Sequence, residues 1–143
     1  MAKARRKVFI SAAASDASKV RDLAGRLNAA GLDAWNSSDE ALPGTNWSAE
    51  IGQAIGRVDA IVVLVSPSSM KSASVRREIQ FALGQARFEN RLIPVLVKRT
   101  PSHEIPWILR GLQWAKGDAD KVAKQIVTML NAPKPREARA QAI

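Results

Sequence analysis

The chain has 143 residues, a formal net charge of +9, one histidine and no cysteine. This length suits one globular domain. The lack of cysteine excludes disulfide scaffolds, cysteine nucleophiles and thiolate metal sites, and it fits a reducing, cytoplasmic compartment. The single His103 leaves no histidine metal cluster, and the longest apolar run, Ala60 to Val65, is too short to cross a membrane. We therefore expect a cytoplasmic domain without a metal site or a membrane span.

Most of the excess positive charge lies at the two ends of the chain. Residues 3–7 contribute four charges and residues 132–143 contribute two, which leaves +3 for the rest. Charge runs of this kind usually mark solvated tails, and the basic residues are not interleaved with the aromatics that single-strand binders use for stacking. We predict a basic tail over 1–6, a folded domain over 7–131 and a linker or disordered tail over 132–143. Nucleic acid is not expected as the main partner.

The first segment predicts a strand, a loop and a helix. Residues 7–11 (KVFIS) form a short apolar run suited to a buried strand. Small and polar residues follow, with a helix cap expected at Ser15 or Asp16. Apolar residues then recur at helical spacing from Val20 to Ala30, and Gly31 stands where a helix often ends in a left-handed residue.

The middle of the chain repeats this alternation. Residues 32–35 (LDAW) predict a second strand, and a turn-rich polar loop leads to a helix that begins near Trp47. Residues 60–65 (AIVVLV) are apolar at every position, as expected for a central strand of a parallel sheet that is covered on both faces. A serine-rich loop over 66–74 then opens into a further helix, which carries Glu78.

The last third predicts two more strands and a helix. Residues 91–97 (RLIPVLV) form the fourth strand, and Pro94 favours a position at or near an edge or bulge because proline cannot donate a ladder hydrogen bond. A short fifth strand is expected over 112–115, followed by a helix over 118–130. Strands that alternate with helices predict an α/β, flavodoxin-like, three-layer domain with a five-stranded parallel sheet in the order 2-1-3-4-5.

This strand order predicts where a ligand binds. In doubly wound sheets the crevice lies beyond the carboxyl ends of the strands, at the point where the strand order reverses, here between strands one and three. The helix with Glu78 begins at this edge. On a helical wheel Glu78 lies at the border between the apolar face and solvent, and no basic residue stands three or four positions away. Pairing across space with Arg76 or Lys71 is one interpretation of this carboxylate, and catalysis is the other.

The chain has no dinucleotide fingerprint, phosphate-binding P-loop or nucleophile elbow, which narrows the chemistry available in the crevice. Cleavage of a ribose–nicotinamide bond is a reaction that needs few catalytic groups. The leaving group departs as a neutral base, so no general acid is required, and one carboxylate near the ribose could stabilise the oxocarbenium-like transition state.

Taken in order, four segments resemble a TIR (Toll/interleukin-1 receptor) domain of the prokaryotic NAD-cleaving type. These are VFIS, GLDAW with DEALPGTNW, AIVVLVSPSSMKSASVRREIQFAL, and LIPVLV with PWILRGLQW. The resemblance spans about residues 7–130. It implies that Glu78 is the catalytic glutamate that cleaves NAD and that Trp47 stacks on a ring of the dinucleotide. The other substrate-binding positions that it implies are Ser11, Ala12, Ser72 and Ser74.

The resemblance also implies function and partners. It predicts an NAD glycohydrolase, or a cyclase, that releases nicotinamide and ADP-ribose or a cyclic isomer, with NAD as substrate and no cofactor. Activity is expected to require homotypic TIR–TIR self-association as a dimer or filament. The chain would act as the effector of a defence or signalling protein, with a regulatory sensor domain or partner. The alternative is a non-catalytic TIR adaptor that works by homotypic docking alone.

Overall fold

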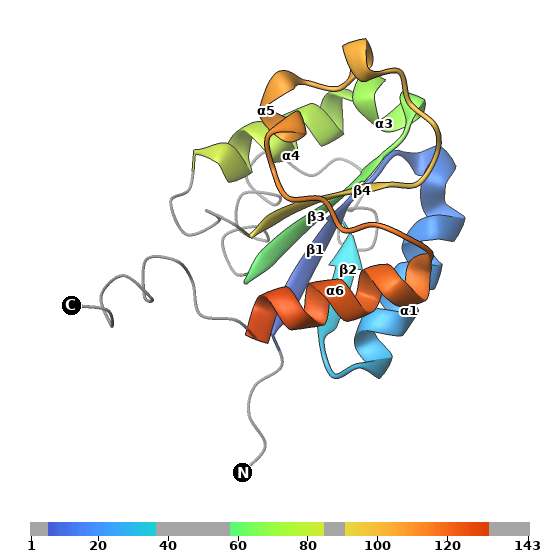
Figure 1. Ribbon diagram of the computed structural model, residues 1–143, viewed down its shortest axis with the longest axis vertical. Helices are drawn as coiled ribbons and strands as arrows, with labels where there is room; N and C mark the ends of the chain where they lie inside the picture. The colour runs from blue at the N-terminus through green and yellow to red at the C-terminus, as the bar shows by residue number, and fades with distance from the viewer. Residues whose placement is uncertain (1–5, 37–57, 85–90, 132–143) are drawn as a thin grey trace, which may run out of the picture.

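The computed structural model describes residues 6–36, 58–84 and 91–131 (Figure 1). Within them the strands are β1 (Lys7–Ser11), β2 (Asp33–Asn36), β3 (Ala60–Val65) and β4 (Leu92–Leu96). All pair in parallel, in the order β2-β1-β3-β4. The predicted flavodoxin-like α/β class is confirmed, with the predicted order of the first four strands. The position of β4 at the edge of this sheet agrees with the expectation from Pro94.

The prediction of a fifth strand over residues 112–115 is wrong. Over residues 112–115 the structure keeps one bridge, between Ala115 and Val95, in which the Ala115 N–H donates to the Pro94 carbonyl at 3.1 Å. Pro94 has no N–H to return a second ladder bond. The residues before the bridge turn back on themselves, since the Leu112 N–H donates to the carbonyl of Leu109. The described sheet therefore has four strands, with Ala115 touching the outer edge of β4.

Helices cover both faces of the sheet (Figure 1). One layer holds α1 (Ala17–Ala29) and α6 (Ala119–Asn131), which contact each other. The other holds α3 (Pro67–Lys71), α4 (Ala73–Leu83) and α5 (Trp107–Arg110). The sequence did not predict α3, in which Ser66 and Ser69 form a reciprocal capping box ahead of Pro67. The predicted three-layer arrangement is confirmed.

Alternation along the strands divides the core into two clusters. In β1, Val8 and Ile10 belong to the cluster beneath α1 and α6, whereas Phe9 belongs to the cluster beneath α4 and α5. Ser11 is the next residue on the Phe9 side, and it is fully buried. The two-residue period of β1 therefore directs Ser11 towards α4.

The boundaries of α1 combine one expected and one unexpected feature. Gly31 adopts a φ of 95°, the left-handed conformation expected for a glycine just after a helix. Asp16 occupies the N-cap position of α1, as the sequence predicts, but its side chain makes no capping hydrogen bond. Its carboxylate is directed elsewhere, towards the ends of β3 and β4.

Three tryptophans lie in the described part of the chain, and they differ in burial. Trp35 is half-buried and meets Phe9 edge-to-face, with ring centroids 5.1 Å apart, and Trp114 packs on the same cluster while its Nε1–H donates to the Leu109 carbonyl. Both therefore contribute to the packing of this cluster. Trp107 differs from both, since it is 74 % exposed at the start of α5. His103 is exposed in a short 3-10 turn.

Among the described residues no helix has the length and apolar content needed to cross a membrane. The predicted C-terminal tail, residues 132–143, lies outside the described residues, as do residues 1–5 of the predicted N-terminal tail.

Asp118 caps the first turn of α6, which gives a pH-dependent prediction. Its Oδ1 accepts the Lys121 N–H at 2.9 Å, and this bond, with the nearby charges of Lys121 and Arg26, holds the pKa of the Asp118 carboxyl below its usual value. A carboxyl whose pKa is lower in the folded state contributes stability above its unfolded pKa and loses it as the pH falls. We expect Asp118→Ala to lower the melting temperature at pH 7 by a few degrees, and the difference from wild type should shrink as the pH falls through the acid range. A constant difference at every pH would contradict this assignment.

Candidate functional site

Glu78 and Ser11 form the centre of the candidate site. Glu78 lies in the middle of α4 and Ser11 ends β1, and the Ser11 hydroxyl donates a hydrogen bond to Glu78 Oε2. Ser11 is 0 % exposed and Glu78 is 1 % exposed. The structure therefore joins two of the predicted site residues, 67 positions apart in the sequence, at the carboxyl edge of the sheet.

The burial of Glu78 corrects its predicted position at the border with solvent. A helical wheel records only the polarity of the helix itself, and it cannot show that the end of β1 lies against that side of α4. The carboxylate accepts a hydrogen bond from Ser11, a partner that sequence spacing does not reveal. Of the two basic residues considered as partners, Arg76 directs its Nε to the Met70 carbonyl at 3.2 Å.

Ser72 and Ser74 lie at the start of α4. Ser72 is half-buried and caps the helix, since its hydroxyl accepts the Val75 N–H at 3.3 Å. Ser74 is exposed, one helical turn before Glu78. Ser72 thus fixes where α4 begins, and Ser74 shares the side of the helix that carries the carboxylate.

Two other predicted site residues have different outcomes. Ala12 is half-buried and packs against the cluster beneath α1 and α6, so it lies on the opposite face of the sheet from Ser11. Trp47 lies outside the described residues. The geometry therefore groups Ser11, Ser72, Ser74 and Glu78 along β1 and α4 and separates Ala12 from them.

A second buried carboxylate, for which the sequence pattern predicts only a helix cap, lies at the same edge of the sheet. Asp16 is 0 % exposed, and its Oδ2 accepts the Ser66 hydroxyl at 2.5 Å while its Oδ1 lies 3.3 Å from Lys98 Nζ. These three residues follow β1, β3 and β4 respectively. The sequence did contain a signal for this cluster. All three residues follow strands of a parallel sheet, and the carboxyl ends of such strands meet at one edge.

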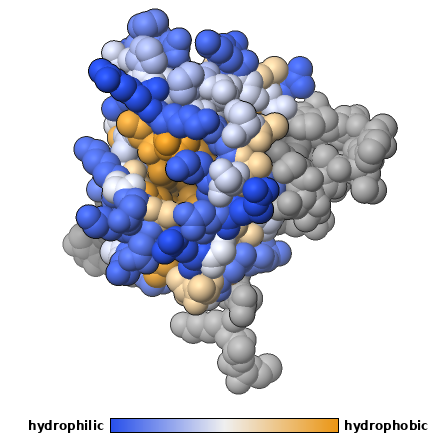
Figure 2. Space-filling model, turned by 90° about the vertical axis from the view of Figure 1, so that its right-hand side faces the viewer, coloured by the Kyte–Doolittle hydropathy of each residue, from blue (hydrophilic) through white to orange (hydrophobic). Residues whose placement is uncertain are grey.

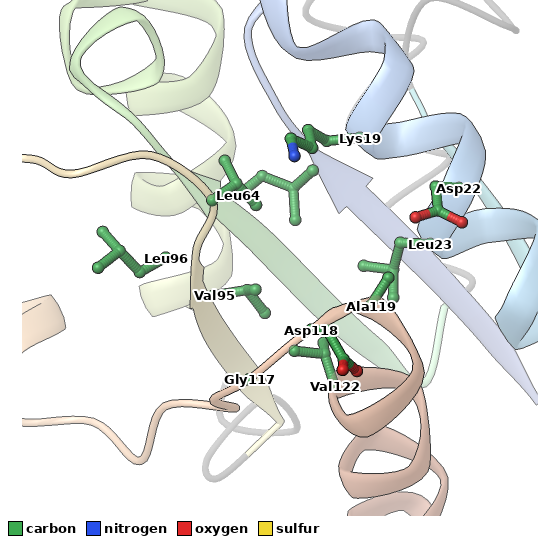
Figure 3. A pocket seen from close by; sticks show the side chains of 11 residues that line it. Lys19, Asp22, Leu23, Leu64, Val95, Leu96, Gly117, Asp118, Ala119 and Val122 are labelled. Carbon is green, nitrogen blue, oxygen red and sulfur yellow. The ribbon is translucent and has the colours of Figure 1, made fainter.

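A pocket of about 290 Å³ opens on the other face of the sheet, between α1, α6 and the ends of β3 and β4 (Figure 3). Leu23, Leu64, Val95 and Val122 form apolar walls, and charged side chains lie around them. Figure 2 shows hydrophobic residues surrounded by hydrophilic ones on one side of the molecule. Glu78 does not line this pocket. It is therefore separate from the candidate site.

The Glu78–Ser11 pair can stabilise positive charge. A carboxylate excluded from water and held by a hydroxyl interacts strongly with a cation that forms beside it, because little solvent reorganisation is needed. Within the described residues no cluster of three potential metal ligands occurs. The fixed carboxylate of the Glu78–Ser11 pair suits a reaction in which positive charge develops on a substrate beside it.

Comparison with protein families gives a match over most of the chain. A family model described as TIR domain matches residues 8–128. A search of curated proteins gave no match.

Solved structures with the same fold come from several sources. A metazoan TIR-STING receptor from C. gigas, in complex with 2',3'-cGAMP, is 25 % identical with a TM-score of 0.73, and the match covers 88 % of this chain but 39 % of that one. The TIR domain of the Toll-related receptor TRR-2 from Hydra magnipapillata is 23 % identical with a TM-score of 0.67 (92 % and 97 % covered). The TIR domains of the activated Roq1 resistosome are 20 % identical with a TM-score of 0.66 (86 % and 98 % covered).

Proposed function

The chain belongs to the TIR domain family, and we propose that it is an NAD glycohydrolase of the prokaryotic NAD-cleaving type. The observation that supports this proposal is the buried Glu78 carboxylate, held by the Ser11 hydroxyl at the carboxyl edge of β1. NAD is the substrate and no cofactor is required. Nicotinamide and ADP-ribose, or a cyclic isomer of ADP-ribose, are the products.

The proposed chemistry breaks the bond between the ribose C1′ and the nicotinamide nitrogen. The bonding electrons leave with nicotinamide, which becomes neutral, and positive charge develops on the ribose. Glu78 stabilises this charge and accepts hydrogen bonds from the ribose hydroxyls. Water then adds to C1′ and loses its proton to solvent, which gives ADP-ribose. In the cyclising variant an adenine nitrogen of the same molecule takes the place of water.

Ser11 has two roles in this proposal. Its hydroxyl fixes the direction of the Glu78 carboxylate in the structure, and it lies at the edge where the ribose would bind. Ser72 and Ser74, at the start of α4, complete the polar side of the site. We also assign Trp47 to substrate stacking. Ala12 follows β1 and would contribute through its backbone, because its side chain packs on the opposite face of the sheet.

Self-association is part of the proposal. The Roq1 comparison is to TIR domains within an activated resistosome, and assembly of this chain into a dimer or filament would bring neighbouring surfaces to the site. A sensor domain or partner would control that assembly, in a defence or signalling role. The activity should therefore depend on protein concentration.

A non-catalytic adaptor is the second candidate. It is favoured by exposed apolar side chains on α4, where Phe81 is 37 % and Leu83 is 44 % exposed. Such residues could dock a second TIR domain without any chemistry at Glu78.

The two candidates are separated by measuring nicotinamide release from NAD over a range of protein concentrations. We expect the turnover per molecule to rise with the assembled fraction, measured in the same samples by light scattering. Assembly without nicotinamide release would support the adaptor and reject the enzyme.

A further inference from the structure

We infer that Asp16 is a positioning residue: through Ser66 it holds the end of β3 against the end of β1 and thereby fixes Glu78 for catalysis. This inference rests on the proposed function for its catalytic consequence. It concerns a buried carboxylate that the Glu78 chemistry does not use. A connected set of hydrogen bonds at the carboxyl edge of the sheet carries it.

Asp16 is a buried carboxylate. Its side chain is fully buried, and it is bonded by the Ser66 hydroxyl and paired with Lys98. Removing a carboxylate from water is unfavourable, and well-packed apolar residues often give equal or greater stability. A gain in stability is therefore a weak explanation for the buried Asp16 carboxylate. A better explanation is that the carboxylate fixes the geometry of the strand ends, because it requires its hydrogen-bond partners at defined positions.

The Ser66 hydroxyl is bonded both as a donor and as an acceptor. The Ser66 hydroxyl donates to Asp16 and accepts the Ser69 N–H at 3.0 Å, and the Ser66 N–H donates to the Ser69 hydroxyl at 2.8 Å. Ser66 therefore links the loop after β1 to the first turn of α3. A displacement of Asp16 would displace the start of α3.

A hydrogen bond from Arg76 connects α3 to the helix that carries Glu78. The α3 and α4 helices are adjacent, and Arg76 on α4 donates its Nε to the Met70 carbonyl at the end of α3. Glu78 follows two residues later and bonds Ser11, which returns the connection to β1. Two buried hydrogen bonds thus join the ends of β1 and β3. Ser11, at the end of β1, donates to Glu78 on α4, which follows β3. Ser66, just after β3, donates to Asp16, which follows β1.

Lys98 supplies the opposite charge from the segment after β4. Its side chain is 51 % exposed, whereas the Asp16 side chain is 0 % exposed, so the pair lies at the boundary between core and solvent. Because the Lys98 side chain stays half-exposed, its pairing with Asp16 requires little desolvation of the lysine. It places a positive charge 3.3 Å from Asp16 Oδ1.

The test compares Ser66→Ala with Ser69→Ala in the full chain. Both substitutions remove half of the α3 capping box, but only Ser66→Ala removes the bond to Asp16. We expect Ser66→Ala to lower kcat for nicotinamide release by about 10-fold or more, up to the roughly 100-fold that a misplacement of about 1 Å produces, with a smaller change in KM. Ser69→Ala should keep kcat close to wild type at temperatures below its melting transition.

A second readout does not depend on activity. The carboxyl carbon of Glu78, one of six glutamates, can be followed by NMR in protein labelled with ¹³C-glutamate and assigned by its loss in Glu78→Gln. We expect its resonance to move in Ser66→Ala and in Asp16→Asn but not in Ser69→Ala. Asp59→Asn is a further control, because Asp59 bonds the Lys7 N–H at the opposite end of β1.

The outcomes separate this inference from the proposed function. A moved Glu78 resonance in Ser66→Ala and Asp16→Asn supports the positioning role even if the wild-type chain releases no nicotinamide, a result that would reject only the NAD proposal. If Ser66→Ala and Asp16→Asn fold and leave both the Glu78 resonance and kcat at the level of Ser69→Ala, the inference is overturned. The inference is also overturned if Ser66→Ala and Ser69→Ala lower the melting temperature equally and neither moves the Glu78 resonance. The cluster would then have a structural role only.

Discussion

The Glu78→Gln variant is expected to release nicotinamide from NAD at least about 100-fold more slowly than wild type, the size of effect seen when one electrostatic stabiliser of a transition state is removed. Glutamine has nearly the same shape as glutamate, and its amide oxygen can still accept the Ser11 hydroxyl, so the fold should survive. Only the negative charge is lost. Since that charge is what we propose stabilises the cationic ribose, the loss should appear in kcat. Nicotinamide release by chromatography, on assembled samples of both proteins, measures it.

Glu104→Gln is the matched control for this substitution. Glu104 is a half-buried glutamate in the 3-10 turn between β4 and α5, outside the candidate site. It should keep wild-type activity. Equal nicotinamide release by Glu78→Gln and wild type, with both proteins shown to be assembled, would remove Glu78 from the reaction and leave the adaptor as the better candidate.

Leu64→Ala is expected to lower the free energy of unfolding by about 2–5 kcal/mol, the range for leucine truncation in a well-packed core. Leu64 is fully buried near the end of β3 and also borders the pocket between α1 and α6. Truncation removes apolar contacts and enlarges that pocket, which the surrounding strands and helices cannot fill without moving. Urea denaturation followed by circular dichroism gives the difference in midpoint and slope.

Leu96→Ala is the control, because Leu96 lines the same pocket from β4 but is 50 % exposed. The same truncation at this position should lower the free energy of unfolding by roughly 0.5 kcal/mol. Equal losses at the two positions would show that burial in the described core does not determine the stability of this edge of the sheet.

Much of the fold follows from local patterns in the sequence. The uninterrupted apolar run of residues 60–65 predicts the central strand with the bounds that β3 has, and the helical spacing before Gly31 predicts α1. Such patterns succeed because the period of side-chain direction belongs to the element itself. Residues 112–115 show the limit. Their apolar pattern suits a strand, but pairing also requires N–H groups on the neighbouring strand, and Pro94 lacks one.

The candidate site was only partly predictable. The sequence by itself determined that Glu78 stands at the carboxyl edge of a doubly wound sheet, because strand order fixes which loops meet there. Only the tertiary structure decided that Glu78 is buried and bonded to Ser11, and that Asp16, which the sequence indicates as a helix cap, instead bonds Ser66 and pairs with Lys98. Hydrogen bonds between residues 50 or more positions apart leave no periodic trace in a sequence. They arise when the packing of helices on the sheet brings separate strand ends within about 3 Å of one another.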